Sequence, residues 1–145
     1  HFLIMLSYSS SGCKYSKRTC NDVVEWFVMN YLPRYKIDIT IHHRGMLRDG
    51  VFGWVGVLDC DYRPREFEIE IHNRLTPKDY IQTLLHELWH VYQHVKGDLK
   101  DKHGIRLWKG VDHSATDYDD QPWEKQAHIM EEILYNQYLT KCLLK

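Results

Sequence analysis

The run His86-Glu87-Leu88-Trp89-His90 combines two imidazoles and a carboxylate at a spacing suited to metal chemistry. Residues four apart lie on one face of an α-helix, so His86 and His90 can reach one Zn²⁺ ion at about 2.0–2.1 Å. In this HExxH pattern the glutamate does not bind the metal but takes a proton from the metal-bound water. The sequence therefore predicts a zinc-dependent hydrolase in which Glu87 is the general base.

Two histidines do not complete a catalytic zinc site, which has three protein ligands and one open position for water. The favoured third ligand is Glu124, in the first turn of a predicted final helix. That helix must pack on the HExxH helix to bury Trp123 and Ala127, and this packing can bring the Glu124 carboxylate over the metal. His103 is the alternative third ligand. His128, four residues after Glu124, can orient that carboxylate by a hydrogen bond.

Hydrolysis of an amide also needs a hydrogen-bond donor for the oxyanion that develops on the carbonyl oxygen. Tyr118 and His113 lie in the loop before Glu124 and are the candidates for this role. His94 lies one turn further along the HExxH helix, so we expect it to flank the cleft rather than to share the ion.

The two helices that would carry the metal are bounded by recognisable end signals. Thr76 is an N-cap, Pro77 occupies the first helical position, and Gly97 ends the HExxH helix. The final helix opens at Pro122 and runs to about residue 140. Its predicted packing stripe contains Trp123, Ala127, Met130, Leu134 and Tyr138.

The residues before residue 76 predict an N-terminal helix and a three-stranded, mainly antiparallel sheet, so the fold class is α+β. The helix is expected over 20–32, and the strands over 37–41, 51–58 and 66–72, with Asp49-Gly50 as a turn. The 51–58 segment is apolar on both faces, which is typical of a central strand. The 66–72 segment is expected at an open edge. That edge either accepts an extended peptide as an added strand or is a plain edge protected by Glu66, Glu68 and Glu70.

Length and composition predict one globular domain over 1–145, with 1–18 as a loop or mobile arm. The formal charge of −1 gives no clear nucleic-acid signature. The apolar run at 2–6 is too short for a signal-peptide core or a membrane span. The four cysteines form no CxxC pair, which favours a reducing compartment and a cytoplasmic location.

The HExxH run, the segment Arg106-Leu107-Trp108-Lys109-Gly110, Tyr118 and the segment Pro122-Trp123-Glu124-Lys125-Gln126-Ala127 together resemble small zincin-type metallopeptidase-like proteins, many of them encoded by phages. The resemblance covers about 45 residues, from 83 to 127. It implies a zincin-like fold, Glu124 in the place of the third ligand of gluzincins, and a peptide or protein substrate. It also implies the cytoplasm of a bacterial host.

Two other functions remain open from the sequence. His103-Gly104, thirteen residues after His90, resembles the element that supplies the third ligand in SprT-like proteases, which act on DNA-bound proteins. The strand expected at 105–108 and the Pro-Trp-Glu element depart from that pattern. The other alternative is a non-catalytic binding module that keeps the zincin fold and its zinc. The intact Glu87 argues against it, because a structural zinc site needs no base.

Overall fold

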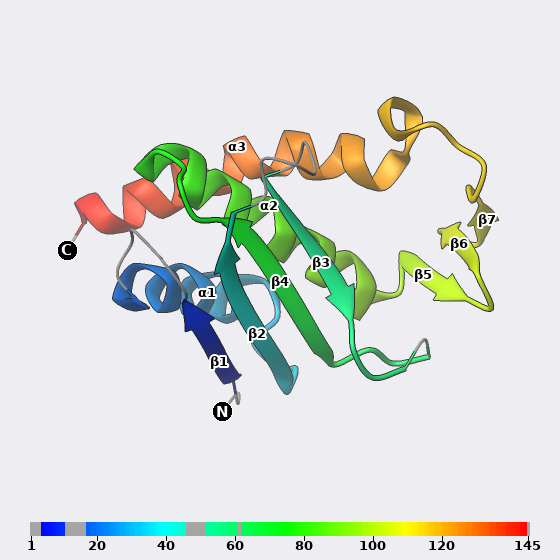
Figure 1. The fold of residues 1–145 in the computed structure, drawn as a ribbon, viewed down its shortest axis with the longest axis horizontal. Coiled ribbons are helices and arrows are strands. Elements are labelled where there is room, and N and C mark those ends of the chain that lie inside the picture. Colours follow the sequence, from blue (N-terminus) through cyan, green and yellow to red (C-terminus); the bar gives the residue numbers. More distant parts are fainter. Residues whose placement is uncertain (1–3, 11–16, 46–51, 61, 145) are drawn as a thin grey trace.

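A computed structural model describes residues 4–10, 17–45, 52–60 and 62–144, and these residues form an α+β fold with two sheets (Figure 1). The larger sheet contains β1 (Ile4–Ser10), β2 (Ile37–Arg44), β3 (Gly53–Val57) and β4 (Glu66–His72). The smaller sheet contains β5 (Leu99–Lys102), β6 (Ile105–Trp108) and β7 (Val111–Asp112). The helices are α1 (Lys17–Tyr31), α2 (Pro77–Lys96) and α3 (Pro122–Leu143), with a 3₁₀ helix η2 (Tyr118–Asp120) before α3.

The N-terminal segment contains a strand, so the expectation of a loop or arm over 1–18 is wrong for residues 4–10. β1 pairs in parallel with β2, with Ile4 beside Ile37 and Ser10 beside His43. Helix α1 forms the crossover between these two strands, as parallel pairing requires. The serine-rich sequence suggested a loop, but strand pairing depends on tertiary context more than on local composition. Residues 11–16 lie outside the described part of the chain.

The larger sheet has four strands in the order β1-β2-β4-β3, and two of its three pairings are parallel, so the expectation of a three-stranded, mainly antiparallel sheet is wrong. β4 lies between β2, to which it is parallel, and β3, to which it is antiparallel. The 66–72 strand is therefore an interior strand, and the apolar 51–58 segment supplies the edge strand β3. Its valines, Val55 and Val57, are only partly buried against the core, because β3 has a neighbouring strand on one side alone. The turn expected at Asp49-Gly50 lies outside the described residues.

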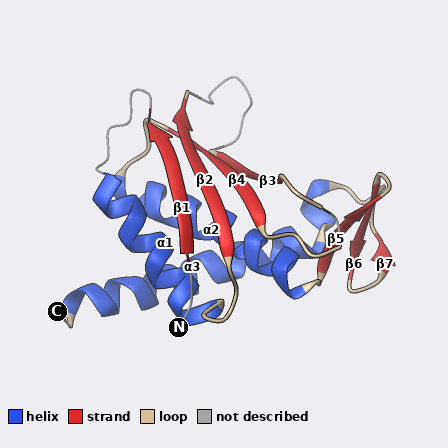
Figure 2. Ribbon diagram, turned by 90° about the horizontal axis from the view of Figure 1, so that it is seen from below, coloured by secondary structure: helices blue, strands red, loops and turns tan. Residues whose placement is uncertain are grey.

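Apolar and polar residues alternate along β2 and β4, and this alternation determines which face of the sheet is buried. One face of each strand points toward the helices, which Figure 2 shows gathered on a single side of the sheet. The fully buried side chains on this face are Ile37, Ile39, Ile41, Phe67, Ile69 and Ile71. The opposite face carries polar residues, including an ion pair of 2.6 Å between Arg44 and Glu70. This arrangement follows the period-2 pattern that the sequence shows.

Helix α2 begins and ends as its sequence predicts, and α3 packs along it (Figure 1). The Thr76 hydroxyl accepts a hydrogen bond from the Asp79 N–H at 3.2 Å, and Gly97 adopts the left-handed conformation at φ 84°. On α3 the predicted stripe is buried, with Met130 partly so. In the described part of the chain, no helix is long and apolar enough to cross a membrane.

Candidate metal centre

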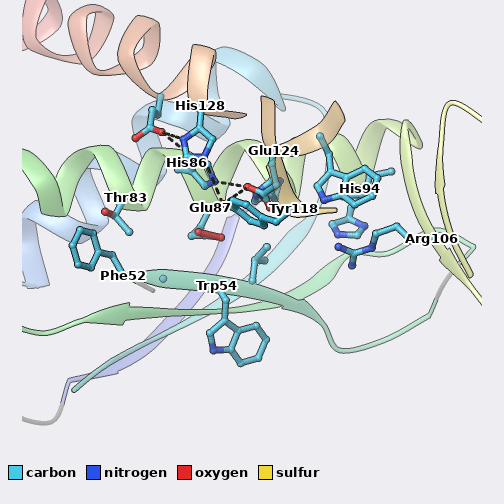
Figure 3. Close-up of a pocket in the computed structure, with 16 residues that line it drawn as sticks. Phe52, Trp54, Thr83, His86, Glu87, His94, Arg106, Tyr118, Glu124 and His128 are labelled. Atoms are coloured by element: carbon cyan, nitrogen blue, oxygen red, sulfur yellow. Dashed lines mark hydrogen bonds and ion pairs between the residues drawn. The ribbon is translucent and has the colours of Figure 1, made fainter. Parts of the chain in front are cut away.

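Three potential metal ligands from α2 and α3 converge on one point (Figure 3). The Glu124 carboxylate lies 3.0 Å from His86 Nε2 and 3.2 Å from His90 Nε2. His86 and His90 are 8% and 5% exposed, and the helix-on-helix packing of Trp123 and Ala127 places Glu124 over them. The structure therefore brings together the three residues that the sequence analysis selects.

The orientation of His90 follows from a chain of hydrogen bonds to the wholly buried Gln93. The Trp123 carbonyl can only accept, so the Gln93 Nε2 that lies 3.0 Å from it must donate. Gln93 Oε1 is then the acceptor that faces His90 Nδ1 at 2.7 Å. His90 Nδ1 consequently carries the proton, and its Nε2 keeps a lone pair that points at the cluster.

The orientation of His86 is determined in the same way by a carboxylate on α3. Glu131 Oε1 lies 3.2 Å from His86 Nδ1 and 2.8 Å from His128 Nδ1. A carboxylate that accepts from Nδ1–H leaves the Nε2 lone pair of His86 free to bind a cation. Histidine ligands of metals are commonly held by such carboxylate or carbonyl partners.

The donor set fits a zinc ion. In a tetrahedral site with ligands at about 2.0–2.1 Å, the ligand atoms are about 3.3 Å apart. The separations of 3.0 and 3.2 Å from Glu124 to the two imidazoles match that spacing. The Nε2 lone pairs of His86 and His90 both face the negative Glu124 carboxylate. A positive charge between these atoms is needed to offset their mutual repulsion. Two nitrogens and a carboxylate oxygen form a donor set found in catalytic zinc sites.

The ionisation of these groups agrees with a cation at this point. Burial by itself lowers the pKa of His86, but the Glu124 and Glu131 carboxylates outweigh it and raise the pKa to about 10. Burial raises the pKa of Glu124, but the neighbouring His86 and His90 imidazoles outweigh it and lower the pKa well below its usual range. The cluster thus stabilises one positive charge, which a metal ion can supply in place of a proton.

Glu87 lies beside the cluster and lines the same cavity of about 620 Å³. Its side chain is buried, and this burial raises the pKa of its carboxyl above the ordinary value. A raised pKa makes a carboxylate a stronger proton acceptor near neutral pH. The Glu87 carboxylate is not one of the ligand atoms that converge, which agrees with a role other than metal binding.

Of the two predicted oxyanion donors, the structure brings only Tyr118 to the cluster. The Tyr118 hydroxyl donates to Glu124 at 3.2 Å and lies 3.5 Å from His128 Nε2. Burial first, and then Glu124, raises the pKa of Tyr118 to about 12, so its hydroxyl keeps its proton near neutrality. His113 instead contacts Thr116 at 3.0 Å and packs edge-on against Trp123, outside the cavity lining.

His128 lies beside His86 and contacts Glu131 at 2.8 Å rather than the Glu124 carboxylate that it was expected to orient, whereas His103 and His94 lie outside the converging group. His103 is exposed in the turn between β5 and β6 and lines a different cavity. His94 is buried and flanks the cleft, as expected, and burial lowers its pKa to about 4, so it is neutral at physiological pH. Figure 3 shows it beside Arg106, at the end of the cleft formed by the small sheet.

The cleft is bounded on its other side by the edge strand β3. Gly53 packs so closely on α2 that a Cβ there would lie 3.0 Å from Thr83 Cγ2 and 3.4 Å from Glu87 Cγ. In Figure 3 the Trp54 side chain lies on the side of β3 away from the cluster. Among the described strands β3 pairs with β4 alone, so its second backbone edge is open along the cleft.

The sequence analysis missed Glu131 and Gln93. Glu131 follows Glu124 by seven residues and His128 by three, so these residues share one face of α3. That spacing was a usable signal for Glu131. Gln93 gave no comparable signal, because an uncharged residue three positions after His90 is common on helices. No protein-family model, no curated protein and no solved structure matches the chain.

Proposed function

We propose that this protein is a zinc-dependent metallopeptidase with a gluzincin-like ligand set. The observation that carries the proposal is the convergence of His86, His90 and Glu124, with the Nδ1 atoms of both imidazoles held by hydrogen-bond acceptors. His86 and His90 would hold the ion from α2, and Glu124 from α3. Bound there, zinc would supply a Lewis acid that acidifies water and polarises a carbonyl oxygen.

The remaining residues of the cleft have roles that follow from their positions. Glu87 accepts the proton of the attacking water and later delivers it to the leaving amine. Its burial raises its pKa, which suits it to both steps. Tyr118 keeps its hydroxyl proton and donates a hydrogen bond to the oxygen on which negative charge develops. Glu131 and Gln93 act as positioning residues for the two imidazoles.

We assign the substrate backbone to β3 rather than to the 66–72 strand, both of whose edges are paired. An extended peptide that pairs with the open edge of β3 would run along the cavity that Glu87 lines. Backbone pairing gives affinity that is independent of sequence, so peptide or protein segments are the natural substrate class. Partly exposed apolar residues on and beside β3, such as Phe52, would contact substrate side chains.

The geometry favours this assignment over the two alternatives. The SprT-like alternative requires His103 as a ligand, and His103 lies in another cavity. The non-catalytic alternative leaves the buried Glu87 without a role. Burying a carboxylate is energetically costly, so a buried carboxyl with a raised pKa beside a candidate metal site is a candidate functional group.

The test combines zinc content with hydrolysis. After dialysis against a weak chelator, elemental analysis should find one zinc per wild-type chain. Glu124→Ala should lose it, and the matched control His103→Ala should keep it. Glu87→Gln should retain zinc but cut the hydrolysis of a mixed peptide library, followed by mass spectrometry, by about 10²–10⁴-fold.

Each arm can contradict a separate part of the proposal. Wild-type protein without zinc overturns the metal site. Zinc loss from His103→Ala with retention in Glu124→Ala overturns the ligand set. Full hydrolysis by Glu87→Gln overturns the proposed base, and zinc binding without any peptide hydrolysis by the wild type would favour the binding module.

A further inference from the structure

The small sheet has two faces with different chemistry. Alternation along β5 and the antiparallel register place Asp101 and Arg106 opposite each other, and Arg106 lines the metal cleft. Lys100 and Lys102 point to the other face, opposite Leu107 and Ile105. The sheet is thus a wall between the metal cleft and a second pocket.

This second pocket is basic and has a volume of about 540 Å³, a size typical of small-molecule sites. Its lining includes three lysines and a histidine but a single carboxylate, that of Asp98. The lysines are Lys100 and Lys102 from β5 and Lys109 from the turn between β6 and β7. Since the whole chain carries a formal charge of −1, this local excess of cations is a distinct feature.

The lysines of the basic pocket are available to a ligand. Lys100, Lys102 and Lys109 are exposed, and none of them forms an ion pair with any carboxylate in the ranges that the structure describes. Lys109 Nζ lies 5.5 Å from the centroid of the Trp108 ring, a contact that leaves its charge unneutralised. Tyr62, 79% exposed, lies at the rim, and Arg63 Cζ lies over its ring at 5.7 Å from the centroid.

Backbone strain is concentrated at the same pocket. Among the described non-glycine residues, His103 and Lys109 alone have positive φ, at 52° and 49°. Each precedes a glycine in a two-residue hairpin turn, a position that asparagine or glycine normally occupies. Both strained residues line the basic pocket. Asparagine or glycine would adopt this backbone conformation with less strain. The presence of His103 and Lys109 at these positions therefore points to a functional rather than a folding role.

We infer that the basic pocket binds a phosphate-bearing ligand of about nucleotide size, either free or as part of a single nucleic-acid strand. Lysine ammonium groups bind phosphate oxygens as point charges, and three lysines line this pocket. An exposed tyrosine beside them can stack on a planar base. The site is separate from the proposed metal centre, so it can be tested by binding alone.

The test measures binding of a fluorescein-labelled twelve-residue oligothymidylate by anisotropy at several salt concentrations, with inorganic phosphate and oligoglutamate as competitors. The double variant Lys100→Gln/Lys102→Gln should bind the oligonucleotide about tenfold or more weakly than wild type. It should also lower the slope of log K against log salt by about 1.4, because each phosphate contact on a single strand contributes about 0.7.

The matched control is Arg18→Gln/Lys78→Gln, which removes the same charge from the first turns of α1 and α2; Figure 1 shows that both helices begin at the end of the molecule away from the small sheet. It should bind like wild type. An equal loss in both double variants, or no oligonucleotide binding by wild type, overturns the inference. Competition by oligoglutamate as strong as by the oligonucleotide also overturns it, in favour of an acidic protein partner. Competition by inorganic phosphate supports a free phosphorylated ligand, and its absence supports a polymer.

A second variant separates a binding role from a structural one. Asparagine tolerates the left-handed conformation better than lysine, so Lys109→Asn should relieve strain and raise the melting temperature by about 2–4 °C. The same variant should weaken oligonucleotide binding, because it removes a cation from the pocket. A variant that gains stability without losing affinity would show that Lys109 does not contact the ligand.

Discussion

The candidate metal cluster and the basic pocket lie on opposite faces of the small sheet and are organised in opposite ways. In the cluster each histidine has its second ring nitrogen fixed by a partner, either the partly buried Glu131 or the buried Gln93. In the basic pocket the lysines have no carboxylate partner within the described residues, and their positions follow from strand β5 and from the turn at Lys109. The cluster is therefore preorganised for one small ion, and the pocket is suited to a larger and more variable anion.

This difference predicts different responses to mutation. A preorganised site depends on residues that never touch the ligand, because each of them holds a donor atom in place. A site of exposed lysines depends on the number of charges, and its affinity falls with salt because exposed charges are screened and compete with counterions. Substitutions behind the ligands should therefore damage the cluster far more than the pocket.

The largest expected effect concerns Glu131, which contacts His86 and His128 but is not one of the three ligands. Glu131→Ala should weaken zinc affinity by about 10–100-fold, because His86 then loses the acceptor that fixes its tautomer and ring orientation. Competition against a chromophoric chelator measures this change. The matched control is Glu132→Ala, one residue away and exposed, which should bind zinc like wild type. Equal affinities for all three proteins would break the comparison, because the cluster would not depend on its supporting residues.

A smaller effect is expected where β3 meets α2 at Gly53. Gly53→Val should destabilise the protein by about 1–3 kcal/mol, since the added atoms overlap the Glu70 carbonyl and the Thr83 methyl group. Urea unfolding followed by tryptophan fluorescence measures the loss. The control is Gly45→Val, because a Cβ at Gly45 meets no atom within 4 Å. Equal stability of the two variants would mean that β3 is not held tightly against the helix that carries the ligands.

The sequence was most informative where local rules act within one helix. The spacing of His86 and His90, the Thr76 cap and the Gly97 terminus each depend on residues within one or two turns, and the structure confirms the last two. The packing stripe of α3 was equally readable, since burial follows the helical period. That packing is what carries Glu124 to the two histidines, so the candidate ligand set could be predicted before the structure.

The sequence failed where pairing between distant segments decides the result. β1 has a serine-rich sequence and is a strand because β2 pairs with it, which no local pattern shows. β3 is apolar on both faces, as an interior strand would be, but it lies at the edge of the sheet and borders the cleft. His113 precedes Glu124 closely in sequence, but its contacts with Thr116 and Trp123 keep it out of the cavity lining.

The smallest expected effect tests the small sheet on its cleft-facing side, where charges are paired rather than left open. Arg106 forms two hydrogen bonds to Asp101, at 2.6 and 2.8 Å, and stands over the Trp123 ring. Burial raises the pKa of the Asp101 carboxyl, but Arg106 outweighs this and holds the pKa below its ordinary value. The pair is about 40% exposed, so solvent screening limits its contribution to stability.

A carboxyl whose pKa is depressed in the folded state stabilises that state at any pH above its unfolded pKa, which is about 3.9 for aspartate. This contribution is lost as the pH falls through the lower folded value. Asp101→Asn should therefore cost about 0.5–1 kcal/mol at pH 7 and nothing once both pKa values are passed in acid. Urea unfolding at a series of pH values measures the difference, with Glu132→Gln as the exposed control. A loss of stability that persists unchanged at low pH would show that Asp101 acts through packing. The ion pair on the cleft-facing side of the small sheet would then not contribute to stability through its charges, and charge pairing would not explain the difference between the two faces.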